Sequence, residues 1–407
     1  MASNEQNISN FPQSSKLIPK EEKLAFLPKK ANLTIAVLKE NSETERRVCL
    51  SPDAVGLLVQ NGHTILIEQG AGIASHFKDI EYSNEGARLV ESKEELLKAN
   101  IILKVSPLND NEILALGKNN TLFTTLQLLS RDKNYFQSLT ERRVTALAFE
   151  KIKDNTGTYP IIRSMGEIVG NSSLHIAAKY LAHHKYGNGS MLGGIPGLKP
   201  TEVVIIGAGT VSENAAKAAI GMGANVKVFD NSVYRLRRLQ SNILNKIFTS
   251  VLQPKILEEA LITADVVLGA MRRQKGNPGF IVPAYMIQKM KQGAVIIDIS
   301  IDQGGIFETS RQTTHDEPVY QEFGVTHYGV PNIASGVPRT ASMALSNIFM
   351  PVILQIAEEG GVDQLLRSNE GFRAGVYMYN GVITDKEIGE SFNLSYRDLE
   401  LLLAILH

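Results

Sequence analysis

Two glycines separated by one residue suggest a site for phosphate groups near the middle of the chain. The apolar run VVIIG predicts a buried strand that ends at Gly207, which permits a tight turn, while Gly209 lets the backbone approach a ligand closely. The alanine-rich segment that follows predicts a helix whose first residues, Thr210 and Val211, present free backbone N–H groups. This pattern predicts a site for a dinucleotide pyrophosphate, with Ser212 in place of the usual third glycine.

An acidic residue follows where such a site needs one for the adenosine ribose. Asp230 ends the next apolar run, NVKVFD, 23 residues after Gly207. A carboxylate there accepts hydrogen bonds from the ribose hydroxyls and repels a 2′-phosphate, so we expect NAD rather than NADP. Arg235, Arg237 and Arg238 weaken this preference, because an arginine can hold a 2′-phosphate. A Rossmann-like domain that binds no nucleotide is the alternative.

Short apolar runs alternate with amphipathic segments along the chain, which is typical of parallel sheets covered by helices on both faces. The first strands are expected at 33–38, 63–68, 101–105, 121–129 and 144–150, with helices at 53–62 and 92–100. After a Gly- and Pro-rich stretch (185–200), strands are expected at 203–207, 225–230, 265–270, 294–300 and 324–329. Long helices are expected at 175–187 and 340–360.

The sequence therefore predicts an α/β fold with two doubly wound Rossmann-like domains and a cleft between them. Residues 161–339 are expected to form the NAD-binding domain, with Gly269 as a further cofactor contact at a strand end. If the helix after residue 339 returns to the first unit, residues 31–160 and 340–407 form one discontinuous substrate domain. Residues 1–30 are polar and are expected to form a flexible arm.

The composition is that of a soluble globular enzyme. The chain has 407 residues, 43% of them hydrophobic, and a formal net charge of zero, which gives no support to nucleic-acid binding. The single cysteine, Cys49, excludes an intrachain disulfide and favours a cytoplasmic setting. No segment is expected to approach the roughly 18 to 20 apolar residues that are needed to span a membrane. His183 and His184 are expected on a helix with rings that point apart, so they do not indicate a metal site.

Several motifs between about Ile35 and about Arg367 resemble those of the alanine dehydrogenase and pyridine nucleotide transhydrogenase alpha-subunit family. They are DISIDQGG (298–305), ERRVCLSP (45–52), the Lys104 of ILKV, MGEIVG (165–170), GGIPG (193–197) and NIASGVPRT (332–340). The resemblance implies NAD as the cofactor, L-alanine and pyruvate as substrates, and a homo-oligomer, with a hexamer favoured over a dimer. The aspartate at position 302 favours the dehydrogenase branch of the family, because many transhydrogenase subunits carry glutamate there.

The resemblance also assigns roles to individual residues. Arg47 matches the family's carboxylate-binding arginine, and Lys104 matches its substrate lysine. Asp302 matches a residue that faces the nicotinamide and helps to handle protons, and Asn332 matches one near the nicotinamide ring. The alternatives are a surface salt bridge for Arg47, a strand-end lysine that extends into solvent for Lys104, and a loop cap for Asn332. Asp298 is expected to be structural.

Gln127 is the departure with the largest chemical consequence. The family carries histidine at this point of TTLQLL (124–129), and that histidine is the expected general acid/base. Glutamine orients a carbonyl or a water by hydrogen bonds but cannot titrate, and general acid–base catalysis is worth about 10²–10⁴-fold in rate. Ser106, Gly166 and Ala334 also differ from the family pattern. We keep Gln127 as a catalytic candidate through hydrogen bonding.

Three functions compete on these observations. The first is an NAD-dependent alanine dehydrogenase in which the arginine and lysine hold the substrate and Asp302, with an ordered water, handles protons. The second is an NAD(H)-binding paralogue with weakened or lost catalysis, motivated by Gln127 and the altered loop after Lys104. No histidine is an evident substitute, although His76, His315 and His327 lie in suitable loops. The third is a transhydrogenase NAD-binding component, which requires a membrane partner and an NADP-binding domain.

Overall fold

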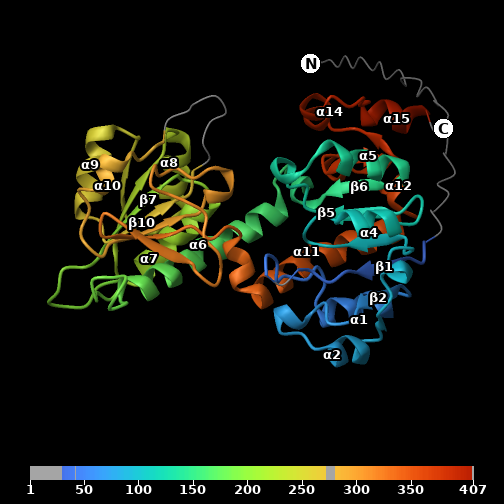
Figure 1. Ribbon diagram of the computed structural model, residues 1–407, viewed down its shortest axis with the longest axis horizontal. Coiled ribbons are helices and arrows are strands. Elements are labelled where there is room, and N and C mark those ends of the chain that lie inside the picture. The colour runs from blue at the N-terminus through green and yellow to red at the C-terminus, as the bar shows by residue number, and fades with distance from the viewer. Residues whose placement is uncertain (1–29, 42, 272–279, 406–407) are drawn as a thin grey trace, which may run out of the picture.

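The computed structural model describes residues 30–41, 43–271 and 280–405, which fold into two units, each built on one sheet (Figure 1). The strands of the first sheet are β1 (Thr34–Val37), β2 (Thr64–Glu68), β3 (Arg88–Val90), β4 (Ile101–Leu103), β5 (Thr121–Thr124), β6 (Thr145–Ala148), β14 (Val376–Tyr379) and β15 (Val382–Ile383). The strands of the second are β7 (Glu202–Ile206), β8 (Asn225–Phe229), β9 (Phe248–Ser250), β10 (Val266–Gly269), β11 (Val295–Asp298), β12 (Val319–Glu322) and β13 (Val325–Tyr328).

Helices cover both faces of each sheet. Those of the first unit are α1 (Pro52–Gln60), α2 (Asp79–Asn84), α3 (Lys93–Leu96), α4 (Asp110–Ala115), α5 (Lys133–Glu141), α12 (Val362–Ser368), α13 (Glu370–Arg373), α14 (Lys386–Phe392) and α15 (Leu399–Ile405). Those of the second are α7 (Thr210–Gly221), α8 (Val233–Asn242), α9 (Pro254–Thr263) and α10 (Ala284–Ile287). Short 3₁₀ turns are η1 (Ile73–Ser75), η2 (Leu128–Ser130), η3 (Phe149–Lys151), η4 (Ile301–Gln303) and η5 (Ile333–Gly336).

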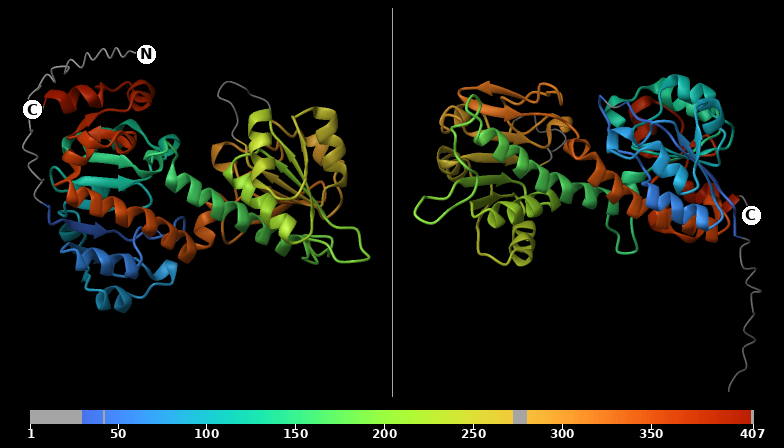
Figure 2. Two further views of the ribbon diagram at one scale, coloured as in Figure 1. Left: turned by 180° about the vertical axis from the view of Figure 1, so that it is seen from behind. Right: turned by 90° about the horizontal axis from the view of Figure 1, so that it is seen from below.

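Two long helices, α6 (Pro160–Leu181) and α11 (Pro338–Glu358), run between the two units (Figures 1 and 2). The first sheet takes β14 and β15 from the chain that follows α11, and β14 pairs antiparallel with β6. The predicted α/β class with two Rossmann-like sheets is confirmed. The domain limits at 160/161 and 339/340 stay our proposal, and this connectivity supports them.

The core of each unit follows from the two-residue period of its strands. In β1, Ile35 and Val37 pack on the face that α1, α11 and α12 cover, whereas Ala36 packs on the face of α4 and α5. In β7, Val203 packs toward α6 and α7, whereas Val204 packs toward α9 and α10. Continuous apolar runs are therefore buried on both sides, as expected for central parallel strands.

The strand order reverses once in each sheet, and the reversal places the candidate residues. The first sheet has the order β15-β14-β6-β5-β4-β1-β2-β3, so successive strands are added on one side of β1 up to β3 and on the other side from β4 onward. The second has the order β12-β13-β11-β10-β7-β8-β9, and its order of connection reverses in the same way between β7 and β10. Ligands of open α/β sheets bind outside the carboxyl ends of strands at such points. Lys104 follows β4, Gly207 follows β7 and Gly269 ends β10.

Several predicted bounds were wrong. The strand expected at 121–129 ends at Thr124, and Gln127 adopts a left-handed backbone with φ 44°. The helix expected at 175–187 begins at Pro160 and ends at Leu181. The helix expected at 92–100 is a single turn, α3. His183 and His184 therefore lie beyond α6, and their rings stack with centroids 4.6 Å apart instead of pointing apart. The arm predicted for residues 1–30 lies almost wholly outside the described residues.

α11 is long and apolar enough to cross a membrane by length and composition, contrary to the expectation that no segment is. Its most apolar window is 44% buried within the structure. Leu345, Phe349 and Ile353 belong to the core of the first unit. We therefore interpret α11 as a core helix.

Candidate functional site

Arg47 lies in the segment between β1 and α1, and its guanidinium forms a two-point ion pair with Glu45. Nε donates to Oε1 at 2.8 Å and Nη2 to Oε2 at 2.6 Å. The Asn332 amide donates to Glu45 Oε2 at 2.8 Å, and Arg47 Nη1 lies 3.3 Å from Met165 Sδ in α6. The side chains are only 11% and 5% exposed, so this is not the surface salt bridge of the alternative interpretation. The structure thus brings Arg47 and Asn332 together where the two units meet.

The Arg47–Glu45 pair stays charged despite its burial. Burial opposes ionisation of Glu45, but the charge and hydrogen bonds of Arg47 lower the pKa of that carboxyl below its ordinary value. Buried ion pairs need such additional hydrogen bonds to offset their desolvation. The pair leaves the Nη1 side of the guanidinium facing α6.

Lys104 is 5% exposed and does not extend into solvent, so the second alternative interpretation is also wrong. Its Nζ lies 2.6 Å from Glu112 Oε2 in α4, and Lys93 Nζ lies 3.0 Å from the other oxygen. Burial opposes ionisation of Glu112, but the charge of Lys104 lowers the pKa of that carboxyl. The ammonium therefore has its countercharge within the first unit.

Sequence reasoning missed Glu40, a buried carboxyl beyond the end of β1. It accepts hydrogen bonds from the backbone N–H groups of Val105 and Ser106 and from the Ser106 hydroxyl. Burial raises its pKa to about 7, against the opposing charge of Lys104. The altered loop after Lys104 is therefore held by Glu40. The signal that could have found this residue is an acid soon after a strand at the reversal point.

Gln127 is exposed three residues beyond β5 and directly precedes the turn η2. The preceding residue, Leu126, donates its N–H to Glu150 Oε1 at 2.8 Å. The second oxygen of Glu150 is buried without a hydrogen-bond partner in the described part of the chain, and burial raises the pKa of this carboxyl. Glu150, which sequence reasoning also missed, is thus a titratable group that holds the Gln127 loop.

The three histidines that were expected in suitable loops differ in their surroundings. His327 lies in β13 rather than in a loop, 1% exposed, with Nε2 2.7 Å from Thr309 Oγ1, so it is not a substitute acid/base. His76 is exposed after η1. His315 has a buried Nε2 without a partner among the described residues, and burial together with the charge of Arg46 lowers its pKa.

The glycine turn after β7 has the form that a pyrophosphate requires. Gly207 has φ 116°, and a Cβ there would lie 2.4 Å from the Ala270 carbonyl oxygen. At Gly209, which precedes the first turn of α7, a Cβ would meet no described atom within 4 Å other than those of Gly209 itself and its chain neighbours. Ser212 Oγ is buried and has no partner among the described residues. At Gly269, a Cβ would lie 2.5 Å from Phe307. These residues fit a dinucleotide.

Asp230 faces this turn from the end of β8 and is 1% exposed. Its Oδ2 accepts the Ala208 N–H at 2.8 Å, and its Oδ1 accepts the Ser232 N–H at 2.7 Å. Arg235 Nη1 lies 3.9 Å from Oδ2, and Arg238 Nη2 donates to the Ala208 carbonyl at 3.4 Å. The carboxylate therefore shapes the glycine turn, and its ribose contact stays a prediction.

The acids of DISIDQGG have different environments. Asp298 is 1% exposed and accepts the N–H groups of Ser300 at 3.2 Å and Ile306 at 3.0 Å, as a structural acid does. A Cβ on Gly305 would lie 2.6 Å from its Oδ2, which accounts for the second glycine. Asp302 is exposed in η4, which follows β11 of the second sheet, whereas Lys104 and Gln127 follow strands of the first.

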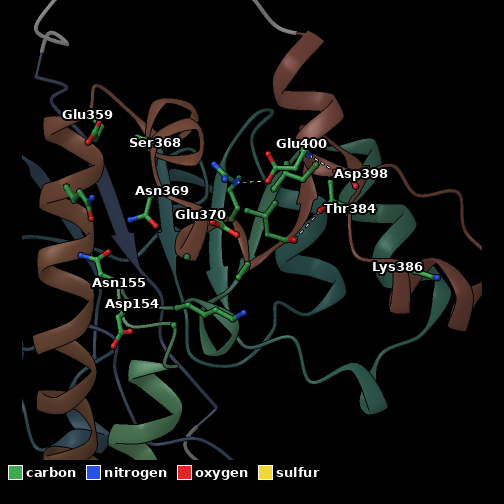
Figure 3. A pocket seen from close by; sticks show the side chains of 18 of the residues that line it. Asp154, Asn155, Glu359, Ser368, Asn369, Glu370, Thr384, Lys386, Asp398 and Glu400 are labelled. Atoms are coloured by element: carbon green, nitrogen blue, oxygen red, sulfur yellow. Dashed lines mark hydrogen bonds and ion pairs between the residues drawn. The ribbon is translucent and has the colours of Figure 1, made fainter. Parts of the chain in front are cut away.

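A hollow of about 970 Å³ opens elsewhere on the first unit (Figure 3). Side chains from the loop after β6, from α13 and from the C-terminal segment line it, among them Asp154, Glu370 and Asp398. None of the predicted site residues lines this hollow, so we do not assign it to the active site.

Comparisons with known proteins cover both units. Profiles of the alanine dehydrogenase/PNT family match residues 36–169 with its N-terminal domain and residues 173–386 with its C-terminal domain. The chain is 37% identical over 369 residues to alanine dehydrogenase of Staphylococcus saprophyticus, covering 90% of this chain and 99% of that one. It is 36% identical, with the same coverage, to alanine dehydrogenase 2 of Staphylococcus aureus.

Solved structures agree with these sequence matches. An L-alanine dehydrogenase structure superposes with a TM-score of 0.81 at 34% identity, covering 88% of this chain and 98% of that one. A transhydrogenase from Sinorhizobium meliloti superposes with a TM-score of 0.74 at 19% identity, over 87% of this chain and 99% of that one, and shares the fold. The chain therefore belongs to the alanine dehydrogenase/PNT family.

Proposed function

We propose that this protein is an NAD-dependent alanine dehydrogenase that converts L-alanine to pyruvate and ammonia, reversibly. The observation that carries the proposal is the arginine of the family's substrate motif, Arg47, buried at the junction of the two units beside Asn332. The near full-length similarity to proteins named alanine dehydrogenase supports the same activity. Asp302 in DISIDQGG supports the dehydrogenase over a transhydrogenase component.

In the proposed reaction Arg47 binds the substrate carboxylate, and Lys104 binds the carboxylate or carbonyl oxygen. Glu45 and Glu112 keep the two cations in place, since each is paired with one of them at 2.6 Å. Gln127 orients a water or carbonyl by hydrogen bonds, and Asp302 helps to handle the proton.

The proposed cofactor is NAD, which accepts the substrate hydride when it is bound. Gly207 and Gly209 would face its pyrophosphate with the N–H groups of Thr210 and Val211, because the space beside Gly209 is open. Asp230 would face the adenosine ribose. Asp302 and Asn332 would lie toward the nicotinamide, and Gly269 would be a further contact of the cofactor.

A second candidate function is an NAD(H)-binding paralogue with weak or lost turnover. The exposed, non-titrating Gln127 favours it, because the family histidine is absent and the structure places His327 in the core. This candidate predicts tight NADH binding with no turnover of small amino or keto acids.

One pair of assays distinguishes the two candidate functions. Purified protein is given saturating NAD and L-alanine at alkaline pH, and NADH formation is followed, while NADH affinity is measured by fluorescence. Alanine-dependent NADH formation supports the enzyme, whereas NADH binding without turnover supports the paralogue. Gln127→His is then expected to raise kcat by about 10²-fold or more, with Gln127→Asn as the non-titrating control. Unchanged turnover in Gln127→His would contradict the role given to position 127.

We also propose a cytoplasmic homo-oligomer, with a hexamer favoured over a dimer, that binds neither nucleic acid nor membrane. Sedimentation equilibrium on purified protein distinguishes the two assemblies. A monomer at micromolar concentration would contradict both.

A further inference from the structure

We propose that Ser335, Ser342 and Ser346 are positioning residues that hold the Arg47 segment in register for the substrate carboxylate. The inference rests on the proposed substrate role of Arg47. The three hydroxyls come from η5 and α11, the chain segment that leaves the second unit, and act on a segment of the first. They would thus align the substrate arginine with the cofactor-binding unit.

Each serine accepts one backbone N–H of the segment between β1 and α1. Arg46 N donates to Ser335 Oγ at 2.8 Å. Val48 N donates to Ser342 Oγ at 2.9 Å. Ser51 N donates to Ser346 Oγ at 2.6 Å. All three serines are at most 1% exposed, so bulk solvent does not reach these hydroxyls.

The described residues of this segment, 38–41 and 43–51, belong to no sheet, so their buried N–H groups need these acceptors. A buried N–H group without a partner costs free energy comparable to a lost hydrogen bond. The serines take the place of a neighbouring strand, and Arg47 N itself donates to Glu45 Oε1 at 3.0 Å. Since a serine side chain is short, each hydrogen bond also limits the distance between η5 or α11 and the backbone from Arg46 to Ser51.

A fourth serine closes the arrangement. Ser75 Oγ donates to the Arg46 carbonyl at 2.6 Å and lies 2.9 Å from Ser342 Oγ. The Arg46 backbone is thus held at both its N–H and its C=O group. This constrains the backbone that immediately precedes Arg47.

The chain from Asn332 to Arg339 contacts the first unit at further points. Asn332 donates to Glu45, and Arg339 donates to the His76 carbonyl and stacks 4.4 Å over the Phe77 ring. β13 of the second sheet ends at Tyr328, just before this stretch. A rotation of the second unit about η5 would therefore act directly on the Arg47 segment.

The first test measures substrate and cofactor affinity separately. We expect Ser342→Ala to raise the KM for pyruvate about fivefold or more, since a buried N–H loses its acceptor, while the Kd for NADH changes by less than about twofold. Ser173→Ala is the matched control, because this buried α6 serine donates only to Val169 O of its own helix, at 2.7 Å. A KM in Ser342→Ala no higher than that of the control would overturn the proposal.

A double-mutant cycle tests whether the effect passes through Arg47. Ser342→Ala is combined with Arg47→Lys, and the KM for pyruvate is measured in all four proteins. We expect Ser342→Ala to change KM little once Arg47 is replaced. If the two fold-changes simply multiply, the serine acts independently of the arginine and the proposal is wrong.

Hydrogen exchange keeps the structural part testable even if the wild-type protein turns over no alanine. Exchange of a peptide covering residues 45–52 is followed by mass spectrometry in the wild type, Ser342→Ala and Ser173→Ala. We expect faster exchange in that peptide for Ser342→Ala alone. Equal protection in all three proteins overturns the serine contacts, whereas absent wild-type turnover with this exchange difference overturns only the proposed function.

Discussion

Replacing Glu40 by glutamine tests the electrostatics at the reversal point of the first sheet. The carboxyl is 8% exposed, and its pKa is raised from 4.5 to about 7 by burial, with Lys104 opposing the shift and Glu45 adding to it. One pKa unit corresponds to about 1.4 kcal/mol. Between pH 4.5 and 7 the unfolded chain loses this proton while the folded chain keeps it. The folded protein therefore loses about 3 kcal/mol of stability across that window as pH rises.

Glutamine imitates the protonated carboxyl. Its oxygen can still accept the Val105 N–H, and its amide can donate to the Ser106 hydroxyl. We therefore expect Glu40→Gln to match the wild type roughly at pH 5 and to exceed its unfolding free energy by about 2–3 kcal/mol at pH 8.

The assay is urea unfolding followed by circular dichroism at several pH values, because the chain has no tryptophan to report by fluorescence. Glu68→Gln, at the end of the adjacent β2, is the control for removing a carboxylate from the same sheet edge. Wild-type and Glu40→Gln stabilities that stay parallel from pH 5 to 8 would refute the reasoning.

Three further outcomes follow from the site. Glu112→Ala leaves Lys104 buried without its partner and is expected to lower the unfolding free energy by about 3 kcal/mol, measured by urea unfolding; a loss below about 1 kcal/mol would contradict a buried pair. Gly207→Ala places a methyl group against the Ala270 carbonyl at a positive φ and is expected to weaken NADH binding at least tenfold (about 1.4 kcal/mol) in a fluorescence titration, with wild-type affinity as the contrary result. Asp230→Ala is expected to weaken NADH binding about tenfold (about 1.4 kcal/mol) and to reduce the preference for NADH over NADPH. An unchanged ratio of the Kd values for NADH and NADPH would count against the ribose contact.

The sequence sufficed for features that local patterns control. The glycine turn was predictable because a buried strand, two small residues and an alanine-rich helix are contiguous in the chain. Lys104 was predictable as a strand-end cation. Its partner was not, because Glu112 reaches it only after α4 has packed back onto the strand. For the same reason Glu40 gained significance only once β1 and β4 were neighbours.

The start of α6 shows why helix propensity did not predict where this helix begins. The stretch after Pro160 contains Gly166, Gly170 and several serines, which are poor residues for a helix interior. In the fold, a Cβ on Gly170 would lie 2.4 Å from the Val211 carbonyl oxygen, so glycine allows α6 and α7 to approach closely. Tertiary packing therefore stabilises a helix that local preference does not predict.

The late position of β14 in the chain sets the order in which the two units can fold during synthesis on the ribosome. Every strand of the second sheet comes from one uninterrupted stretch, from Glu202 to Tyr328, so this half can fold as soon as that stretch has emerged. The first half begins earlier yet finishes later, since β6 gains its antiparallel neighbour only after Val376–Tyr379 has been synthesised. Until then one edge of a mostly apolar sheet stays unpaired, and nascent chains are most exposed to misassembly in that interval.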